Sequence, residues 1–163
     1  MARQIWLLRH AEAEPHGTRT DAQRKLTERG EQQAAAAGAA LCELAGGFER
    51  VLTSSKVRAA ETARIALASL DGAQAEEFAP LVDGLDAQGV IEQARALGAD
   101  GRLLLVGHEP QLSTLVAELT GAHADLKKGG IAAVRLDGGR GELAVLLRPR
   151  EVFAIAGLQL DGH

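Results

Sequence analysis

Two histidines and two arginines stand where the sequence changes from apolar to polar, and their chemistry suits a phosphoryl group. Arg9 and His10 follow one short apolar run, His108 follows another, and Arg58 comes just after a third candidate strand. A guanidinium presents a fork of donors that matches the oxygens of phosphate or carboxylate. An imidazole is neutral near pH 7 and can act as a base, a ligand or a nucleophile. These four residues therefore indicate a site for an anionic, phosphate-like group.

The predicted strands and helix beside these residues are expected to bring them together. Uninterrupted apolar runs at 5–8 and 103–106 are typical of buried parallel strands, because helices need longer periodic segments. A further strand is predicted at 48–53, followed by Ser54 and a helix. Ligands of open α/β sheets bind outside the carboxyl ends of the strands, and the first turn of a helix favours an anion. Arg58 in such a first turn opposes the helix dipole, which indicates that a negative group lies there.

Strands that alternate with helices predict an α/β fold, a three-layer αβα sandwich with a mostly parallel central sheet. The last third differs, because two β-rich runs flank Asp137-Gly138-Gly139 and predict an antiparallel hairpin at the sheet edge. The 163 residues fit one domain, and we expect a single domain over 1–163. Helices are predicted from the N-cap Thr27 to Gly46, after Ser55, after Asp86, from Pro110 as the first helical residue to Leu119, and over 149–158.

Composition excludes several classes of partner. The net charge is −4, only 2% of residues are aromatic and there is no Tyr, so no nucleic-acid binding is expected. No window approaches the length of a membrane span or a signal peptide, so we expect a cytoplasmic protein with no membrane partner. The single cysteine, Cys42, cannot form an internal disulfide and is predicted to fill a small space in the core.

Four motifs in chain order extend the pattern beyond single residues. Together they resemble the signatures of the histidine phosphatase superfamily, which has the phosphoglycerate mutase-like fold. The size of the chain, its His-Glu-Pro variant and the segment 127–131 are most similar to the small SixA-type phosphohistidine phosphatases. The motifs are Leu8-Arg9-His10-Ala11, Leu26-Thr27-x-x-Gly30-x-x-Gln33-Ala34, Ser54-Ser55-x-x-Arg58-Ala59-x-x-Thr62-Ala63 and Val106-Gly107-His108-Glu109-Pro110.

The resemblance implies a phosphatase in which His10 becomes transiently phosphorylated and water then hydrolyses the phosphohistidine. Arg9, Arg58 and His108 are the residues that the resemblance assigns to holding the transferred group, without a metal or another cofactor. One departure is Ala11, which stands where the superfamily has Gly. Because the change is small, we expect it to be tolerated.

A proton donor is the part of the superfamily pattern that this chain does not clearly reproduce. Many members have a glutamate in the segment that matches 76–86. The candidates here are Glu77, Asp83 and Asp86, of which Asp83 is ranked first and Asp86 also fits a helix N-cap. Imidazole leaves phosphohistidine more readily than an alkoxide leaves a sugar phosphate, so the missing acid favours phosphohistidine in proteins as the substrate. Ser54 and Arg19 are further candidates for substrate binding, and for Arg19 a solvated loop is the alternative.

Three alternatives remain at this point. A small phosphate ester could be the substrate of the same chemistry. A metal hydrolase could use His10, Glu12, His108 and Glu109, although no third histidine has a natural position. A non-catalytic module that binds phosphoryl groups could share the fold, because a fold alone does not determine function.

Overall fold

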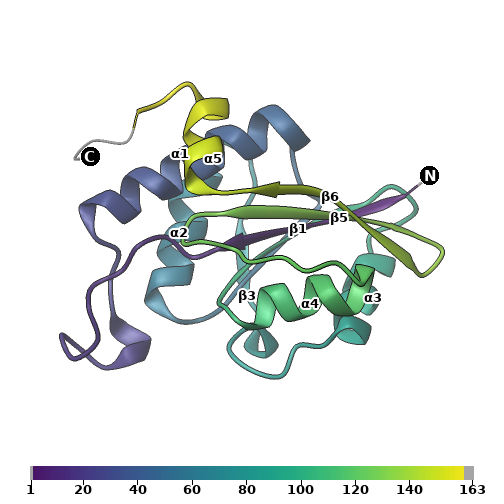
Figure 1. Cartoon of the computed structure of the whole chain (residues 1–163), viewed down its shortest axis with the longest axis horizontal. Coiled ribbons are helices and arrows are strands. Elements are labelled where there is room, and N and C mark those ends of the chain that lie inside the picture. Colours follow the sequence, from purple (N-terminus) through teal and green to yellow (C-terminus); the bar gives the residue numbers. More distant parts are fainter. Residues whose placement is uncertain (1, 160–163) are drawn as a thin grey trace.

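A six-stranded sheet forms the middle of the molecule (Figure 1). The structure, a computed structural model, describes residues 2–159. The strands lie in the order β3-β2-β4-β1-β5-β6; the first four are parallel, β5 is antiparallel to β1, and β6 is antiparallel to β5. The predicted mixed sheet with an antiparallel edge hairpin is confirmed. The strands are β1 (Arg3–Arg9), β2 (Arg50–Thr53), β3 (Ala75–Glu77), β4 (Arg102–Gly107), β5 (Ile131–Asp137) and β6 (Arg140–Leu147).

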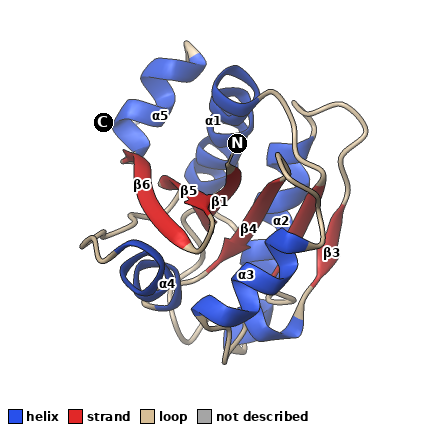
Figure 2. Ribbon diagram, turned by 90° about the vertical axis from the view of Figure 1, so that its right-hand side faces the viewer, coloured by secondary structure: helices blue, strands red, loops and turns tan. Residues whose placement is uncertain are grey.

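Helices cover both faces of the sheet and complete the three layers (Figure 2). Trp6 and Leu8 of β1 join the buried cluster under α1, α2 and α5, whereas Ile5 and Leu7 join the cluster under α3 and α4. Successive strand side chains point to opposite faces, so an uninterrupted apolar run reflects burial on both. The helices are α1 (Glu28–Ala45), α2 (Val57–Leu67), α3 (Ala87–Arg95), α4 (Gln111–Thr120) and α5 (Pro149–Ala156), with 3₁₀ turns η1 (Asp21–Gln23) and η2 (Ala79–Leu81).

Capping residues set the limits of α1 as the sequence predicts. The Thr27 hydroxyl accepts a hydrogen bond from the Gly30 N–H at 3.0 Å, and Gly46 ends the helix with φ at +81°. Small residues then let α1 approach α2, because a Cβ on Gly38 would lie 2.2 Å from the carbonyl oxygen of Ala66. Among the helices that the structure describes, none has the length and apolar character needed to cross a membrane.

The structure corrects three local predictions. Cys42 is exposed and not in the core, because the buried stripe of α1 passes through Leu41 and Ala45 on another side of the helix. Pro110 is the N-cap residue of α4, so the helix begins at Gln111, one position after the predicted start. The strand predicted at 48–53 begins at Arg50.

Candidate active site

The carboxyl ends of β1 and β4 bring the two predicted histidines together. These strands are parallel neighbours, and Arg9 pairs with Gly107 in their register. His10 and His108 follow directly, and the His10 N–H donates to the Gly107 carbonyl oxygen at 2.9 Å. The centroids of the two imidazole rings lie 5.1 Å apart. Pairing of two parallel strands therefore places two titratable groups side by side.

The hydrogen bonding of His10 determines which ring nitrogen is free to react. Nδ1 lies 2.8 Å from the carbonyl oxygen of Ala11. Because a carbonyl oxygen can only accept, Nδ1 carries the proton and Nε2 keeps its lone pair. Burial lowers the pKa of His10 from 6.5 to about 3, since the imidazolium would lose its hydration, and the nearby charges of Arg58 and Arg9 act in the same direction. His10 is thus neutral at pH 7, as a nucleophile must be.

This lowered pKa couples His10 to stability. The unfolded chain takes up a proton at His10 near pH 6.5, whereas the folded protein does so only at about pH 3. Below pH 6.5 the unfolded state therefore binds more protons, and the free energy of unfolding falls as the pH drops towards 3. We expect His10 to contribute a slope of up to about 1.4 kcal/mol per pH unit.

Urea unfolding of the wild type and of His10→Asn measures this contribution across roughly pH 4.5 to 7.5. The variant should lose stability less steeply on acidification, because the other titratable groups are common to both proteins. Parallel plots of unfolding free energy against pH would contradict the lowered pKa of His10.

His108 is held by Ser54, the residue after β2. Its Nε2 lies 2.8 Å from Ser54 Oγ, which is fully buried and also accepts from the Lys56 N–H at 3.2 Å. Burial lowers the pKa of His108 from 6.5 to about 4, and the positive charge of Arg58 adds to the effect. Within residues 2–159, the buried Nδ1 of His108 has no hydrogen-bond partner. The predicted substrate residue Ser54 therefore contacts His108 in this structure.

Arg9 is held by the segment 126–130, which crosses beside the end of β1. Its Nη1 donates to the Leu126 carbonyl oxygen at 2.9 Å, and the Gly129 N–H lies 3.2 Å from the carbonyl oxygens of both Arg9 and His10. Gly129 adopts a φ of +78°, which favours glycine. The buried Nε of Arg9 has no partner in the part of the chain that the structure describes. An unpaired buried donor is costly, so this guanidinium is set to receive an anion.

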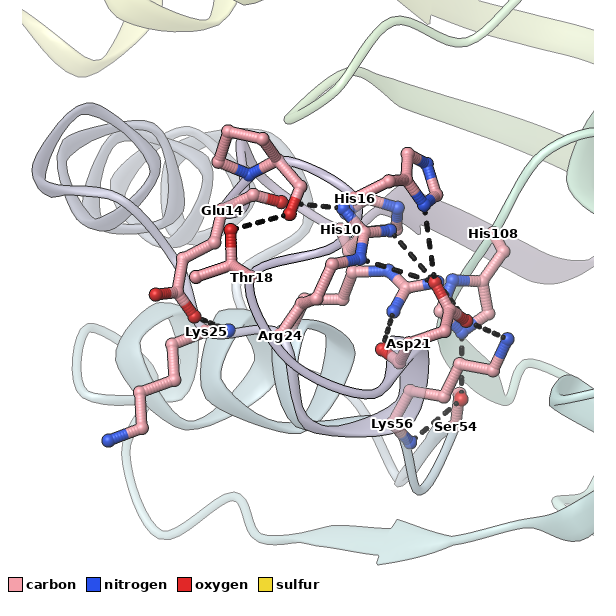
Figure 3. A network of polar contacts seen from close by, with 12 residues as sticks. His10, Glu14, His16, Thr18, Asp21, Arg24, Lys25, Ser54, Lys56 and His108 are labelled. Carbon is pink, nitrogen blue, oxygen red and sulfur yellow. Dashed lines mark hydrogen bonds and ion pairs between the residues drawn. The ribbon is translucent and has the colours of Figure 1, made fainter.

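Arg58 lies in the first turn of α2, where the sequence indicates a negative group. Its side chain is 7% exposed; Nη1 donates to the Asp21 carbonyl oxygen at 2.7 Å and Nη2 to the Asp21 carboxylate at 3.3 Å. The carboxylate also pairs with Lys56 and Arg24 (Figure 3). The protein itself thus supplies an anion beside Arg58. Sequence reasoning missed Asp21, because two of its partners, Lys56 and Arg58, lie 35 and 37 residues further along the chain.

The spacing of Arg58 and Thr62 within the third motif has a structural reason: Thr62 connects α2 to the segment after β1. The Ala11 N–H donates to Thr62 Oγ1 at 3.0 Å, and the Thr62 hydroxyl donates to the Arg58 carbonyl oxygen at 2.7 Å. The Ala11 side chain is fully buried beside Leu26 and Ala34. The methyl group that departs from the superfamily pattern therefore packs in a small apolar cluster.

Glu12 forms its hydrogen bonds with residues at the start of α1, and it does not join the two histidines. Its N–H donates to the Gln33 amide oxygen at 2.9 Å, and its carboxylate accepts from the Thr27 hydroxyl at 2.9 Å. A Cβ on Gly30 would lie 2.0 Å from the Glu12 carbonyl oxygen, so only glycine fits this approach. The ligand set of the metal-hydrolase alternative is not assembled. Across residues 2–159, no group of three or more His, Cys, Asp or Glu side chains is placed to hold a metal ion.

All four residues that first indicated the site line one cavity of about 340 Å³. A second cavity, of about 400 Å³, shares Arg58, His108 and Glu109 with it and extends to Asp83 in the loop before α3. The two hollows therefore meet at Arg58 and His108. The first cavity is lined by Arg9, His10, Ala13, Glu14, Pro15, His16, Arg24, Arg58, His108, Glu109 and Lys128.

Two other predicted residues lie outside these linings. Arg19 forms an exposed ion pair with Glu14 at 2.8 Å, so the structure does not bring it to the anion site. Arg24, which sequence reasoning did not single out, lines the cavity instead and donates to the Glu14 carbonyl oxygen at 2.7 Å. The exposed Asp86 caps α3 by accepting from the Gly89 N–H at 2.9 Å, the alternative that its sequence position offered.

Comparisons with known proteins give the same family. The model of the histidine phosphatase superfamily (branch 1) matches residues 5–82. An uncharacterised protein of Picosynechococcus sp. is 32% identical over 146 residues, which cover 80% of this chain and 86% of that protein. The solved structure of the protein histidine phosphatase SixA complexed with tungstate has a TM-score of 0.81 and 27% identity, covering 91% of this chain and 99% of that one.

A shorter match is to the mitochondrial serine/threonine-protein phosphatase Pgam5 of Drosophila persimilis, 47% identical over 70 residues. It covers 43% of this chain and 24% of the length of Pgam5. The layered α/β fold and much of the sequence of this chain thus have counterparts among phosphatases. The chain belongs to the histidine phosphatase superfamily, and it is a phosphatase. The predicted resemblance to SixA-type members is confirmed.

Proposed function

We propose that this phosphatase acts without a metal, through a phosphohistidine formed on His10, and that phosphohistidine in proteins is its substrate. The observation that carries the proposal is the hydrogen bond from His10 Nδ1 to the Ala11 carbonyl oxygen. It leaves a neutral Nε2 as the nucleophile in a cavity that Arg9 and Arg58 also line. A neutral nucleophile beside fixed cations is what phosphoryl transfer requires.

The reaction proceeds in two transfers. The Nε2 lone pair of His10 attacks phosphorus, the new N–P bond forms, and the bond from phosphorus to the leaving group breaks. Water then attacks the phosphorus held by His10: a P–O bond forms, the N–P bond breaks and returns its electron pair to Nε2, the water releases a proton to solvent, and inorganic phosphate leaves with the oxygen of that water. The guanidinium groups of Arg9 and Arg58 bind the non-bridging oxygens in both steps, so their positive charge is already in place. The imidazole of His108, which burial keeps neutral at pH 7, assists them by hydrogen bonding to the same group.

The leaving group decides which substrates this site can process. The second cavity offers it a place, because that cavity meets the first at Arg58 and His108 and contains Asp83. Asp83 is an exposed carboxyl and is our candidate proton donor. An imidazole leaving group needs less help from an acid than an alkoxide does. Similarity to SixA, a protein histidine phosphatase whose solved structure holds the tetrahedral oxyanion tungstate, supports the same substrate class.

The match to Pgam5 favours a second candidate, a phosphatase of phosphoserine or phosphothreonine in proteins. The matched 70 residues are 43% of the chain and 47% identical. Small phosphate esters are the third possibility that the same chemistry would allow. The three candidates differ in the leaving group and not in the nucleophile.

Turnover of four substrates in the presence of a chelator separates these candidates. The probes are a peptide phosphorylated on histidine, the same peptide with phosphoserine, an aryl phosphate and a sugar phosphate. We expect the highest kcat/KM with the phosphohistidine peptide, a measurable rate with the aryl phosphate, and no loss of either rate with chelation. Fastest turnover of phosphoserine or of the sugar phosphate would replace the proposed substrate, and vanadate binding without any turnover would favour a binding module.

A further inference from the structure

Asp21 lies at the centre of a cluster of basic side chains beside the active site (Figure 3). Its Oδ2 accepts from Lys56 Nζ at 2.9 Å and from Arg58 Nη2 at 3.3 Å. Its Oδ1 accepts from Arg24 Nε at 3.2 Å and from Arg24 Nη2 at 3.1 Å, and its carbonyl oxygen accepts from Arg58 Nη1 at 2.7 Å. His16 Nδ1 lies 3.9 Å from the same carboxylate. The hydrogen bond from Lys56 lowers the pKa of Asp21 well below its usual range, so the carboxyl stays ionised.

The cavity lining shows on which side of Arg58 this carboxylate lies. Arg58 and Arg24 line the cavity that contains His10, whereas Asp21 does not line it. Asp21 therefore contacts the guanidinium groups without lining the space for the phosphoryl group. Its side chain is 45% exposed, whereas that of Arg58 is only 7% exposed.

The contacts fix the direction of the Arg58 guanidinium. One residue accepts from both Nη1 and Nη2, and such a fork sets the plane of the group. The remaining donors stay free, including Nε, which is buried and has no partner within the described residues. The donors that Asp21 does not use are thus the ones available to an anion.

We propose that Asp21 is a positioning residue, which holds Arg58 in the direction needed to bind the phosphoryl group. The inference rests on the role of Arg58 in the proposed function. Asp21 acts only through this guanidinium and does not touch the substrate.

Two effects of removing the Asp21 charge have opposite signs, which makes the proposal testable. A negative charge beside an anion site weakens anion binding by Coulomb repulsion. If Asp21 acted through its charge alone, removal of that charge would therefore tighten anion binding. Loss of positioning instead slows the chemical step, because the transition state needs a correctly directed donor and a small displacement costs up to about 10²-fold in rate.

The test is Asp21→Asn, which keeps the shape of the side chain and removes the charge. We expect kcat for the aryl phosphate to fall by about 10- to 10²-fold. The KM and the Kd for vanadate should be unchanged or lower. Glu151→Gln is the matched control, because it removes a carboxylate from the surface ion pair with Arg148, and neither residue lines the site. Circular dichroism and thermal unfolding confirm that each variant is folded.

A double-mutant cycle with Arg58→Ala then asks whether Asp21 acts through Arg58. In the Arg58→Ala background, Asp21→Asn should change kcat by less than about 2-fold, since the two residues would form one unit. An equal loss in both backgrounds, or unchanged kcat with tighter vanadate binding, overturns the positioning role. If Arg58→Ala itself keeps wild-type turnover, the proposed role of Arg58 fails together with the inference. Loss of turnover in Arg58→Ala but not in Asp21→Asn overturns the inference alone.

Discussion

Replacing His10 with Asn is expected to abolish turnover and the covalent phosphoenzyme together. The amide has no lone pair on nitrogen that can attack phosphorus, so the N–P bond cannot form. Loss of a nucleophile costs at least about 10⁴-fold in kcat in enzymes whose catalytic groups act as a unit. The measurement is a quench in alkali after mixing with a substrate labelled in its phosphoryl group. Wild-type protein should retain label that acid releases, because phosphohistidine is labile in acid, and His10→Asn should retain none.

The matched control is His123→Asn, which changes a histidine that lies outside the lining of the active-site cavity. It should keep both the label and the wild-type rate. Vanadate should still bind to His10→Asn, because Arg9, Arg58 and His108 are present. Label or turnover that persists in His10→Asn would mean that another group carries the phosphoryl. Loss of vanadate binding and of the folded circular dichroism signal would mean instead that the substitution acts on the fold.

Much of the fold follows from local signals in the sequence. The apolar run at 103–106 predicts a buried central strand, and β4 lies between β2 and β1 with both faces covered. The glycines Gly138 and Gly139 predict the turn of the edge hairpin, and both adopt positive φ as a primed turn requires. Such signals depend on a few adjacent residues, so they predict the local structure without any knowledge of the tertiary contacts.

The error at Cys42 shows where local periodicity stops being informative. Positions three and four residues after a buried residue lie on nearly the same face of a helix, so a pattern alone cannot choose between them. After Leu41, the structure buries Ala45 and leaves Leu44 42% exposed. The direction in which the stripe turns depends on the helices packed against α1, and those come from distant parts of the chain.

The difference between local signals and long-range packing also explains which site residues the sequence predicts and which it misses. Arg9, His10 and His108 could be predicted to meet because each follows a strand, and parallel strands end at one edge of the sheet. Arg24 and Asp21 lie in or beside a short 3₁₀ turn with no regular pattern. Their role depends on how that turn packs on α2, which no periodicity encodes. Sequence reasoning could therefore place an arginine in this loop near the site but could not choose Arg24 over Arg19.

Replacing Arg9 with Ala should lower kcat/KM by about 10³-fold, because the site loses a fixed positive charge aimed at the developing transition state. Arg9→Lys should recover only part of this loss. A lysine keeps the charge, but it cannot donate to the Leu126 carbonyl oxygen and to an anion with the geometry of a guanidinium fork. We expect the lysine variant to remain about 10²-fold below wild type.

Arg19→Ala provides the comparison, since it removes an arginine from the neighbouring loop without touching the cavity lining. It should leave kcat/KM for the aryl phosphate unchanged. The same three variants titrated with vanadate separate binding from chemistry, and Arg9→Ala should weaken vanadate binding while Arg19→Ala does not. Equal losses in Arg9→Ala and Arg19→Ala would show that the general positive charge of this region matters, and not a guanidinium fixed between Leu126 and the phosphoryl group.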